Sequence, residues 1–290
     1  MKAQRVGSRG FLFTFEDPYK TNMYVINGDK HIFVCDTFLG PDPIKEVLKY
    51  LEKNGVKGKP FVVFNSHYDY DHYWGNQCFK ESIILAQEQC RLNMEVEGEN
   101  DLKEFESHKK GAIELTYPNT LFHKKISFVD DVVEFYHTPG HTNDSSSCYD
   151  YFDQVLFVGD NIEKPLPYLR ISNLDDYTNT LKEYLTRDAK FIISGHDDLM
   201  DNYDLVKSNL EYLESFGPGK VDRTKLDKKQ RGTHYINLTT IGHYFKTEGN
   251  KKEALEYYKE AEEILQESDK TEQITKLKEK ITAIIKELEE

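Results

Sequence analysis

The part of the sequence best suited to carry out chemistry is a short run rich in histidine and aspartate. Four potential metal ligands fall within six residues there: His67, Asp69, Asp71 and His72. Their imidazole nitrogens and carboxylate oxygens form a mixture that zinc, iron and manganese accept as ligands. Without a cation, four ionisable groups so close together would repel one another or need separate hydration. The run therefore predicts a metal site.

Three further motifs place a histidine or an aspartate beside a glycine. They are Thr138-Pro139-Gly140-His141-Thr142, Gly159-Asp160 and Ser194-Gly195-His196. Any one of them alone is more often a simple turn than a ligand. Each nevertheless follows a short apolar run, and residues at the ends of neighbouring strands converge in space even when they are far apart in sequence. We therefore expect His141, Asp160 and His196 to join the first four residues.

The elements that must position these residues alternate between short apolar runs and amphipathic stretches from Phe11 to about residue 200, which is typical of a layered α/β domain. The strands expected nearest the motifs cover residues 61–64, 132–136, 155–158 and 191–194. Asn27-Gly28 is a strong hairpin signal between two earlier strands. A helix is expected over residues 43–54, and an acidic surface helix over residues 87–110.

The composition changes near residue 218, where a charged stretch with few apolar residues is typical of a linker. We therefore expect a main domain over residues 1–217, and a linker with a helical extension over residues 218–290. Seven residues of the extension have the order and spacing of a single tetratricopeptide unit: Leu238, Ile241, Gly242, Phe245, Ala254, Tyr258 and Ala261. An apolar stripe from Ile274 to Leu288 predicts a closing helix. A lone unit of this kind must pack on the main domain, on a second copy of the chain or on a protein partner.

The overall composition narrows the class of protein. The 290 residues carry 51 acidic and 38 basic side chains, a formal net charge of −13, which disfavours binding to nucleic acid. The apolar runs are strand-sized, so no membrane-spanning helix is expected, and residues 1–5 lack the apolar stretch of a secretory signal. The four cysteines show no CxxC pair and are expected to be reduced. These features predict a cytoplasmic protein.

In their order along the chain, the motifs resemble those of the metallo-β-lactamase superfamily over about residues 10–200. The matching positions are Asp36 after an early strand, the run from His67 to His72, and then His141, Asp160 and His196. The resemblance implies a four-layer αββα sandwich, in which two mixed sheets face each other and helices lie outside. It also implies two divalent metal ions at one edge of the sandwich, with zinc expected first and iron or manganese as alternatives.

The resemblance further implies a role for each position. The first metal site would use His67, Asp69 and His141, the second would use Asp71, His72 and His196, and Asp160 would bridge the two ions. Asp36 would accept a hydrogen bond near the ligands and fix the orientation of an imidazole. Its simpler role would be to cap the end of a strand.

Position 69 departs from the family, which usually has histidine where this chain has Asp69. If Asp69 is a ligand, two divalent ions, three carboxylates and a bridging hydroxide sum to zero net charge, against plus one for the usual set. Carboxylate ligands favour harder ions such as manganese or iron over zinc, and the spacing resembles the His-x-Glu-x-Asp-His variant of flavodiiron proteins. The identity of the metal therefore stays open at this point, and a half-occupied first site is an alternative.

The reaction implied by the resemblance is hydrolysis by a metal-bound hydroxide, with Asp71 orienting the water and accepting its proton. The substrate would be a small molecule with an ester, thioester, lactone or related bond, because the chain shows no export signal typical of β-lactamases and no long inserted domain typical of the nucleases. One alternative is a di-iron redox enzyme that acts on dioxygen or a sulfur compound. Another is a non-catalytic scaffold that binds a partner through the helical extension.

Four aromatic residues surround the ligand run and are candidates for the substrate pocket: Tyr68, Tyr70, Tyr73 and Trp74. Aromatic side chains beside a site more often serve packing than substrate contact. No pair of lysine or arginine residues near the motifs indicates recognition of phosphate or of a peptide-like thiol cofactor. We therefore assign no charged group to substrate recognition from the sequence.

Overall fold

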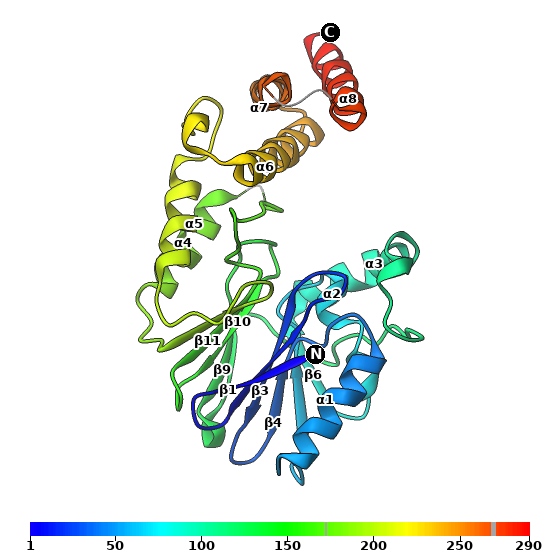
Figure 1. Ribbon diagram of the computed structural model, residues 1–290, viewed down its shortest axis with the longest axis vertical. Coiled ribbons are helices and arrows are strands. Elements are labelled where there is room, and N and C mark those ends of the chain that lie inside the picture. The colour runs from blue at the N-terminus through cyan, green and yellow to red at the C-terminus, as the bar shows by residue number, and fades with distance from the viewer. Residues whose placement is uncertain (172, 268–270) are drawn as a thin grey trace.

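The computed structural model describes residues 1–171, 173–267 and 271–290. Two β-sheets pack face to face, helices cover their outer faces, and three further helices stack at one end of the sandwich (Figure 1). The predicted αββα sandwich with a C-terminal helical extension is therefore confirmed.

The first sheet has seven strands that follow one another in sequence order. They are β1 (Lys2–Val6), β2 (Gly10–Phe15), β3 (Thr21–Asn27), β4 (Ile32–Cys35), β5 (Phe61–Phe64), β6 (Ile83–Gln87) and β7 (Thr120–Phe122). Strands β1 to β4 are antiparallel and include the predicted hairpin, whereas β4 to β7 are parallel. Parallel neighbours need crossover connections, and these carry α1 (Pro41–Lys53) and α3 (Glu88–Glu104) onto the outer face of the sheet.

The second sheet has five strands in the order β12-β11-β10-β9-β8. They are β8 (Lys125–Phe128), β9 (Val133–His137), β10 (Ser146–Asp150), β11 (Val155–Gly159) and β12 (Phe191–Ser194). Only β11 and β12 are parallel, and α4 (Leu174–Tyr184) connects them, while α5 (Asp204–Ser215) follows β12. Both helices pack against the outer face of this sheet. The strands predicted near the motifs correspond to β5, β9, β11 and β12.

The alternation of side chains along β3 shows how the layers form. Tyr24 and Ile26 face the second sheet and share a buried cluster with its Phe135. Met23 and Val25 point the other way, into the cluster beneath α1 and α3. Because successive side chains of a strand point to opposite faces, an apolar strand buried on both sides serves two layers at once.

Helix α3 differs from its prediction as a surface element. It ends at Glu104 and is followed by a short 3-10 turn, Glu106–His108. Cys90 and Met94 are fully buried against the first sheet, so the helix is half embedded. The acidic residues that suggested a surface helix occupy its solvent face.

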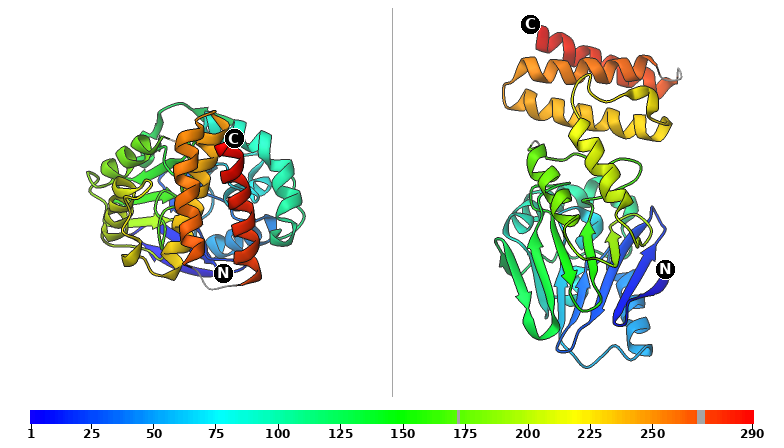
Figure 2. Two further views of the ribbon diagram at one scale, coloured as in Figure 1. Left: turned by 90° about the horizontal axis from the view of Figure 1, so that it is seen from above. Right: turned by 90° about the vertical axis from the view of Figure 1, so that its left-hand side faces the viewer.

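The extension consists of α6 (Lys228–Thr247), α7 (Lys251–Gln266) and α8 (Glu272–Glu289), stacked side by side (Figure 2). A capping box between Asp227 and Gln230 starts α6. Leu238 and Ile241 of α6 lie in the same buried cluster as α4 and α5, so hydrophobic packing continues from the main domain into the extension. The tetratricopeptide-like character of these helices stays a prediction.

The cysteines and the helices agree with the composition. All four cysteines are free thiols, and three of them are buried. Among the described residues, no helix combines the length and the apolar character needed to cross a membrane.

Candidate metal centre

The predicted ligands lie at one edge of the sandwich, on loops that follow four strands. The run from His67 to the short helix α2 (Tyr70–Tyr73) follows β5, His141 follows β9, Asp160 follows β11, and His196 follows β12. Parallel strands end at the same edge of their sheet, which explains this convergence. All seven predicted ligands belong to groups whose candidate ligand atoms lie within 4.8 Å of one another. Their roles as ligands stay a prediction.

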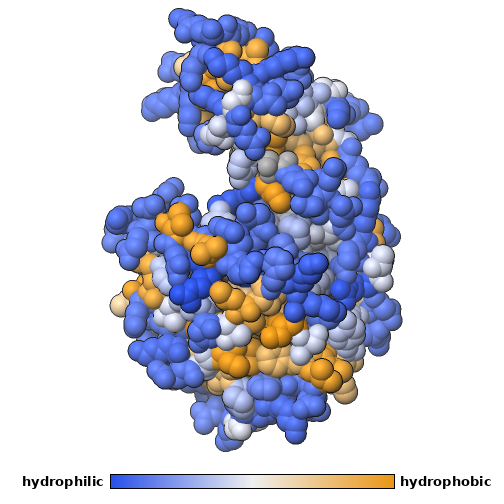
Figure 3. Space-filling model, turned by 180° about the vertical axis from the view of Figure 1, so that it is seen from behind, coloured by the Kyte–Doolittle hydropathy of each residue, from blue (hydrophilic) through white to orange (hydrophobic). Residues whose placement is uncertain are grey.

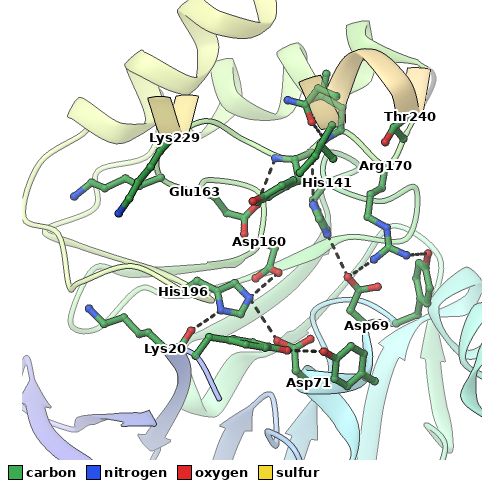
Figure 4. A pocket seen from close by; sticks show the side chains of 18 of the residues that line it. Lys20, Asp69, Asp71, His141, Asp160, Glu163, Arg170, His196, Lys229 and Thr240 are labelled. Carbon is green, nitrogen blue, oxygen red and sulfur yellow. Dashed lines mark hydrogen bonds and ion pairs between the residues drawn. The ribbon is translucent and has the colours of Figure 1, made fainter. Parts of the chain in front are cut away.

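The four histidines share one arrangement, in which Nδ1 is held by a neighbouring group and Nε2 points into the cluster, and Figure 4 shows this for His141 and His196. The partners of Nδ1 are Ser66 Oγ for His67 (3.0 Å), Asp36 Oδ2 for His72 (2.7 Å), Tyr168 O for His141 (3.2 Å) and Lys20 O for His196 (2.6 Å). Such partners fix the tautomer and the ring orientation of metal-binding imidazoles. The arrangement therefore leaves four Nε2 atoms available to a cation.

Asp69 reaches the cluster from the position where the family usually has histidine. Its Oδ2 lies 3.5 Å from His67 Nε2 and 3.3 Å from His141 Nε2. The same oxygen accepts a hydrogen bond from the guanidinium of Arg170, which also donates to Tyr68 Oη at 2.6 Å. Asp69 is therefore long enough to join the first group, and it carries an arginine as counter-charge.

The second group forms around Asp71 and is connected to the first by Asp160. Asp71 Oδ2 lies 3.5 Å from Nε2 of both His72 and His196. Asp160 Oδ2 lies 3.0 Å from His196 Nε2 and 3.4 Å from His72 Nε2, and 3.6 Å from His67 Nε2 in the first group. This grouping is the one that the sequence resemblance implied, with Asp160 between the two sets.

Orphaned atoms in the cluster fit a pair of cations. His67 Nε2, His72 Nε2 and Asp160 Oδ1 are buried, and none has a hydrogen-bond partner in the part of the chain that the structure describes. Buried polar atoms without partners are costly, and a bound cation would satisfy them. The backbone at Gly195 passes so close that a Cβ there would come within 1.9 Å of Asp160 Oδ1. Glycine is therefore required beside this carboxylate.

The electrostatics of the cluster also favour cations. Burial disfavours a charged imidazole, yet the carboxylates of Asp160 and Asp71 raise the pKa of His196 to about 10. Burial likewise disfavours a charged Asp160, but the neighbouring histidines, first His196 and then His72, hold its pKa well below the usual range. Asp160 thus stays ionised and attracts positive charge, which divalent ions would supply.

Asp36 lies directly behind the cluster and is fully buried. It accepts hydrogen bonds from Ser66 N (2.8 Å), Ser66 Oγ (2.7 Å) and His72 Nδ1 (2.7 Å). Its backbone has a φ of 62°, a region that residues other than glycine rarely adopt and that recurs at functional sites. This placement suits the orienting role predicted for it.

A pocket of about 990 Å³ opens above the cluster. Five of the predicted ligands line it: Asp69, Asp71, His141, Asp160 and His196. Tyr68 and Tyr70 line its wall and stay candidates for substrate contact. Tyr73 and Trp74 instead are 1% exposed and pack in the core beneath α1 and α3. We therefore correct the candidate set for substrate contact by removing these two residues.

Charged residues that the sequence did not single out also line the pocket: Lys20, Glu163, Lys164, Arg170 and Lys229. Four basic side chains thus gather at the site although no lysine or arginine pair stands out near the motifs in the sequence, because folding brings Lys20, Arg170 and Lys229 in from other segments. Glu163 lies three residues after Asp160, and this short spacing is the signal in the sequence that indicates it. Burial and the carboxylate of Asp160 raise the pKa of Glu163 to about 7. Arg170 and Lys229 have no comparable signal.

Helix α6 forms one wall of this pocket and holds the loop opposite it. Asn237, fully buried, donates from Nδ2 to Pro167 O (2.8 Å) and accepts at Oδ1 from Leu169 N (3.0 Å). Tyr244 Oη donates to Arg170 O (2.8 Å). A deep notch separates the rest of the extension from the main domain when the molecule is seen from behind (Figure 3). The first helix of the extension thus belongs to the site.

Comparison with known proteins assigns the chain to a family. Residues 17–196, more than half of the chain, match the model of the Metallo-beta-lactamase superfamily. Acyl-coenzyme A thioesterase MBLAC2 from Gallus gallus is 23% identical over 229 residues, which cover 70% of this chain and 82% of that protein.

Solved structures share the fold. A metallo-beta-lactamase from Pontibacter korlensis aligns with a TM-score of 0.60 and 18% identity, covering 74% of this chain and 99% of that chain. The DIM-1 metallo-beta-lactamase aligns with a TM-score of 0.58 and 17% identity, covering 73% of this chain and 96% of that chain. The chain therefore belongs to the metallo-beta-lactamase superfamily and is a hydrolase of that fold, with the histidine and aspartate clusters typical of a binuclear metal site.

Proposed function

We propose that this chain hydrolyses acyl thioesters with the aid of two divalent cations. The observation that carries the proposal is the meeting of four histidine Nε2 atoms and three aspartates beneath an open pocket. Mixed sites of this kind activate water for attack on a carbonyl. A thioester is favoured over an oxygen ester or a lactone because the related chicken protein is named an acyl-coenzyme A thioesterase.

Each side chain of the cluster has a role in this proposal. His67, Asp69 and His141 would hold one ion, Asp71, His72 and His196 would hold the other, and Asp160, which lies near both groups, would contribute to either, while Asp36 fixes the ring of His72. When bound, the two ions would lower the pKa of a water molecule and polarise the thioester carbonyl. The Asp71 carboxylate would orient that water and accept its proton.

The contact between Asp69 and Arg170 bears on the di-iron alternative. Aspartate in place of histidine lowers the charge of the ligand set by one, and the guanidinium of Arg170 restores it. The guanidinium is held in place by Tyr68, whose ring centre lies 5.1 Å from the guanidinium carbon. The pair gives the site the charge of the usual hydrolytic set, so we propose zinc as the resident ion.

The place of α6 bears on the scaffold alternative. We propose residues 1–217 as the catalytic domain and residues 218–290 as a linker and helical extension. Ile236, Asn237, Thr240 and Tyr244 of α6 line the pocket. A helix that forms a wall of the candidate site suits an enzyme better than a separate docking tail.

The test uses the full chain loaded with zinc and a set of thioesters, oxygen esters and lactones with matched acyl groups. We expect the highest kcat/KM on thioesters. His67→Ala should lower this value by about 10³-fold and reduce the bound metal, because it removes a ligand of the first ion.

The matched control is His123→Ala, since His123 is an exposed histidine outside the cluster that contacts Glu88 at 2.7 Å. It should keep both metal content and turnover. Protein that holds two zinc ions and hydrolyses no thioester would overturn the proposal. Two iron atoms per chain after purification without added metal, together with oxygen consumption, would support the redox alternative instead.

A further inference from the structure

Three lysines from distant segments meet at the rim of the pocket, and none of their side chains holds a predicted ligand. Lys20 lies in the turn between β2 and β3, Lys164 in the loop after β11, and Lys229 in the first turn of α6. We call these residues the lysine rim. Figure 4 shows Lys20 and Lys229 on one side of the cluster, opposite Arg170 and Thr240. The rim is therefore a distinct part of the pocket wall.

The fold itself does not use most of this positive charge. Lys164 and Lys229 form no ion pair within 4.0 Å among the residues that the structure describes. Asp197 is a carboxylate close to this charge: burial raises its pKa, and Lys164 and Lys20 act in the opposite direction, although neither forms an ion pair with it in the described part of the chain. Lys20 pairs with Asp198 at 2.6 Å, but the side chain of Asp198 is 84% exposed, so water screens this contact. Arg170, by contrast, is committed to Asp69. The lysine rim is thus available to an anion from outside.

The setting makes the lysine rim unusual for this molecule. The chain as a whole carries a formal charge of −13, and the pocket floor is lined by carboxylates. Three cations gathered at one side of such a pocket create a local field of opposite sign, which raises the local concentration of anionic ligands. This positive field favours a substrate that is anionic at the end that lies against the lysine rim.

We propose that the lysine rim binds phosphate groups on the thiol half of the substrate, so that the substrate class is an acyl thioester of a phosphate-bearing carrier thiol. This inference rests on the proposed function, because the thioester must lie over the metal cluster while the anionic end reaches the rim. Lysine binds phosphate as a point charge on a flexible stem, and several lysines suit several phosphates. The pocket volume of about 990 Å³ accommodates such an extended ligand.

The test compares two thioesters with the same acyl group, one on coenzyme A and one on pantetheine, which lacks the phosphates. The double variant Lys164→Gln/Lys229→Gln should raise KM for the coenzyme A thioester about tenfold and change KM for the pantetheine thioester less than about twofold. Its kcat on either substrate should stay near the wild-type value, because neither lysine belongs to the candidate metal groups. The control Lys190→Gln/Lys251→Gln removes the same charge from exposed positions outside the pocket and should leave both KM values unchanged.

Binding of free coenzyme A and free pantetheine, measured by titration calorimetry on the metal-loaded full chain, separates the two proposals. Tight binding of coenzyme A that is lost in the double variant supports the lysine rim even if no thioester is hydrolysed. Turnover of both thioesters with equal KM, together with equal binding of both thiols, overturns the lysine rim and leaves the proposed hydrolysis standing. Absence of both turnover and binding overturns both proposals.

Discussion

Replacing Asn237 by alanine should damage the metal centre from a distance. Asn237 belongs to α6, yet its side chain holds the backbone of Pro167 and Leu169. The same loop holds His141, since Tyr168 O accepts from His141 Nδ1 (3.2 Å) and the Arg170 N–H donates to His141 O (3.1 Å). Loss of the asparagine should therefore loosen the loop and, with it, one ligand of the first ion.

The magnitude follows from the hydrogen bonds that are lost. The variant leaves the N–H of Leu169 and the C=O of Pro167 without their partner, at a cost of about 1–3 kcal/mol for each buried group. We expect the free energy of unfolding to fall by about 2–6 kcal/mol in total. Removing a group that orients a metal ligand typically lowers metal affinity or activity by about 10- to 100-fold, and we expect a loss in the same range for Asn237→Ala.

The assay must separate this positioning effect from a general loss of stability. Leu238→Ala is the matched control, because Leu238 is the next residue of α6, is fully buried and lies in the shared hydrophobic cluster. Leu238→Ala should lower the free energy of unfolding by a similar amount, about 2–5 kcal/mol. Metal affinity by equilibrium dialysis and kcat/KM are then measured at a temperature where both variants are folded. Equal losses in the two variants, or wild-type metal affinity in Asn237→Ala, would refute the reasoning.

Other side chains around the cluster give independent tests. Arg170→Met should bind the first metal ion about tenfold more tightly in equilibrium dialysis, because Asp69 loses a competing cation, and should turn over more slowly; unchanged affinity would contradict the pairing. Asp36→Asn should weaken metal binding by about 10- to 100-fold, since His72 loses the acceptor of its Nδ1–H, and full metal content at limiting metal would argue against this role. Burial raises the pKa of Glu260 in α7, but hydrogen bonds from His234 and from the backbone N–H of Gly219 lower it by more, so the pKa lies below its usual value. The ionised carboxylate therefore stabilises the fold at neutral pH, and this stabilisation is lost as pH falls through the lowered pKa. Urea unfolding should show a steeper loss of stability below about pH 4 in the wild type than in Glu260→Gln, and parallel curves would exclude this effect.

The convergence of the candidate ligands could be predicted from the sequence because each of them follows a strand end. His67, Asp160 and His196 lie within three residues of the end of a strand, and the carboxyl ends of parallel strands meet at one edge whatever the detailed packing. The layered α/β class followed from the same pattern, since strands buried on both faces need helices or a second sheet on each side, whereas the four-layer αββα arrangement was implied by the resemblance to the superfamily. Local signals of this kind can be identified in a single sequence because they depend on backbone geometry and not on contacts between distant residues.

The pocket walls could not be predicted, because they depend on contacts between distant segments. Arg170 meets Asp69 across 101 positions of the chain, and the loop that carries it has no periodic pattern. The choice among the aromatic residues depends on α3, which packs over Tyr73 so closely that a Cβ at Gly98 would come within 2.8 Å of Tyr73 Oη. Residues next to a candidate ligand in the sequence therefore need not lie beside it in the pocket, as Tyr73 shows, and residues far away in the sequence can, as Arg170 shows.

The placement of α6 explains how a lone helical unit can be stable here. One part of the helix, with Leu238 and Ile241, completes the cluster on α4 and α5, and the next helix, α7, joins both this cluster and the one that contains α8. The face that lines the pocket carries Asn237 and Lys229. A substrate that contacts Lys229 and the floor at the same time binds fully only when α6 is docked, so its binding energy also stabilises that docking. Substrate affinity and the stability of the extension are thereby linked, in addition to the hydrophobic packing that joins the extension to the main domain.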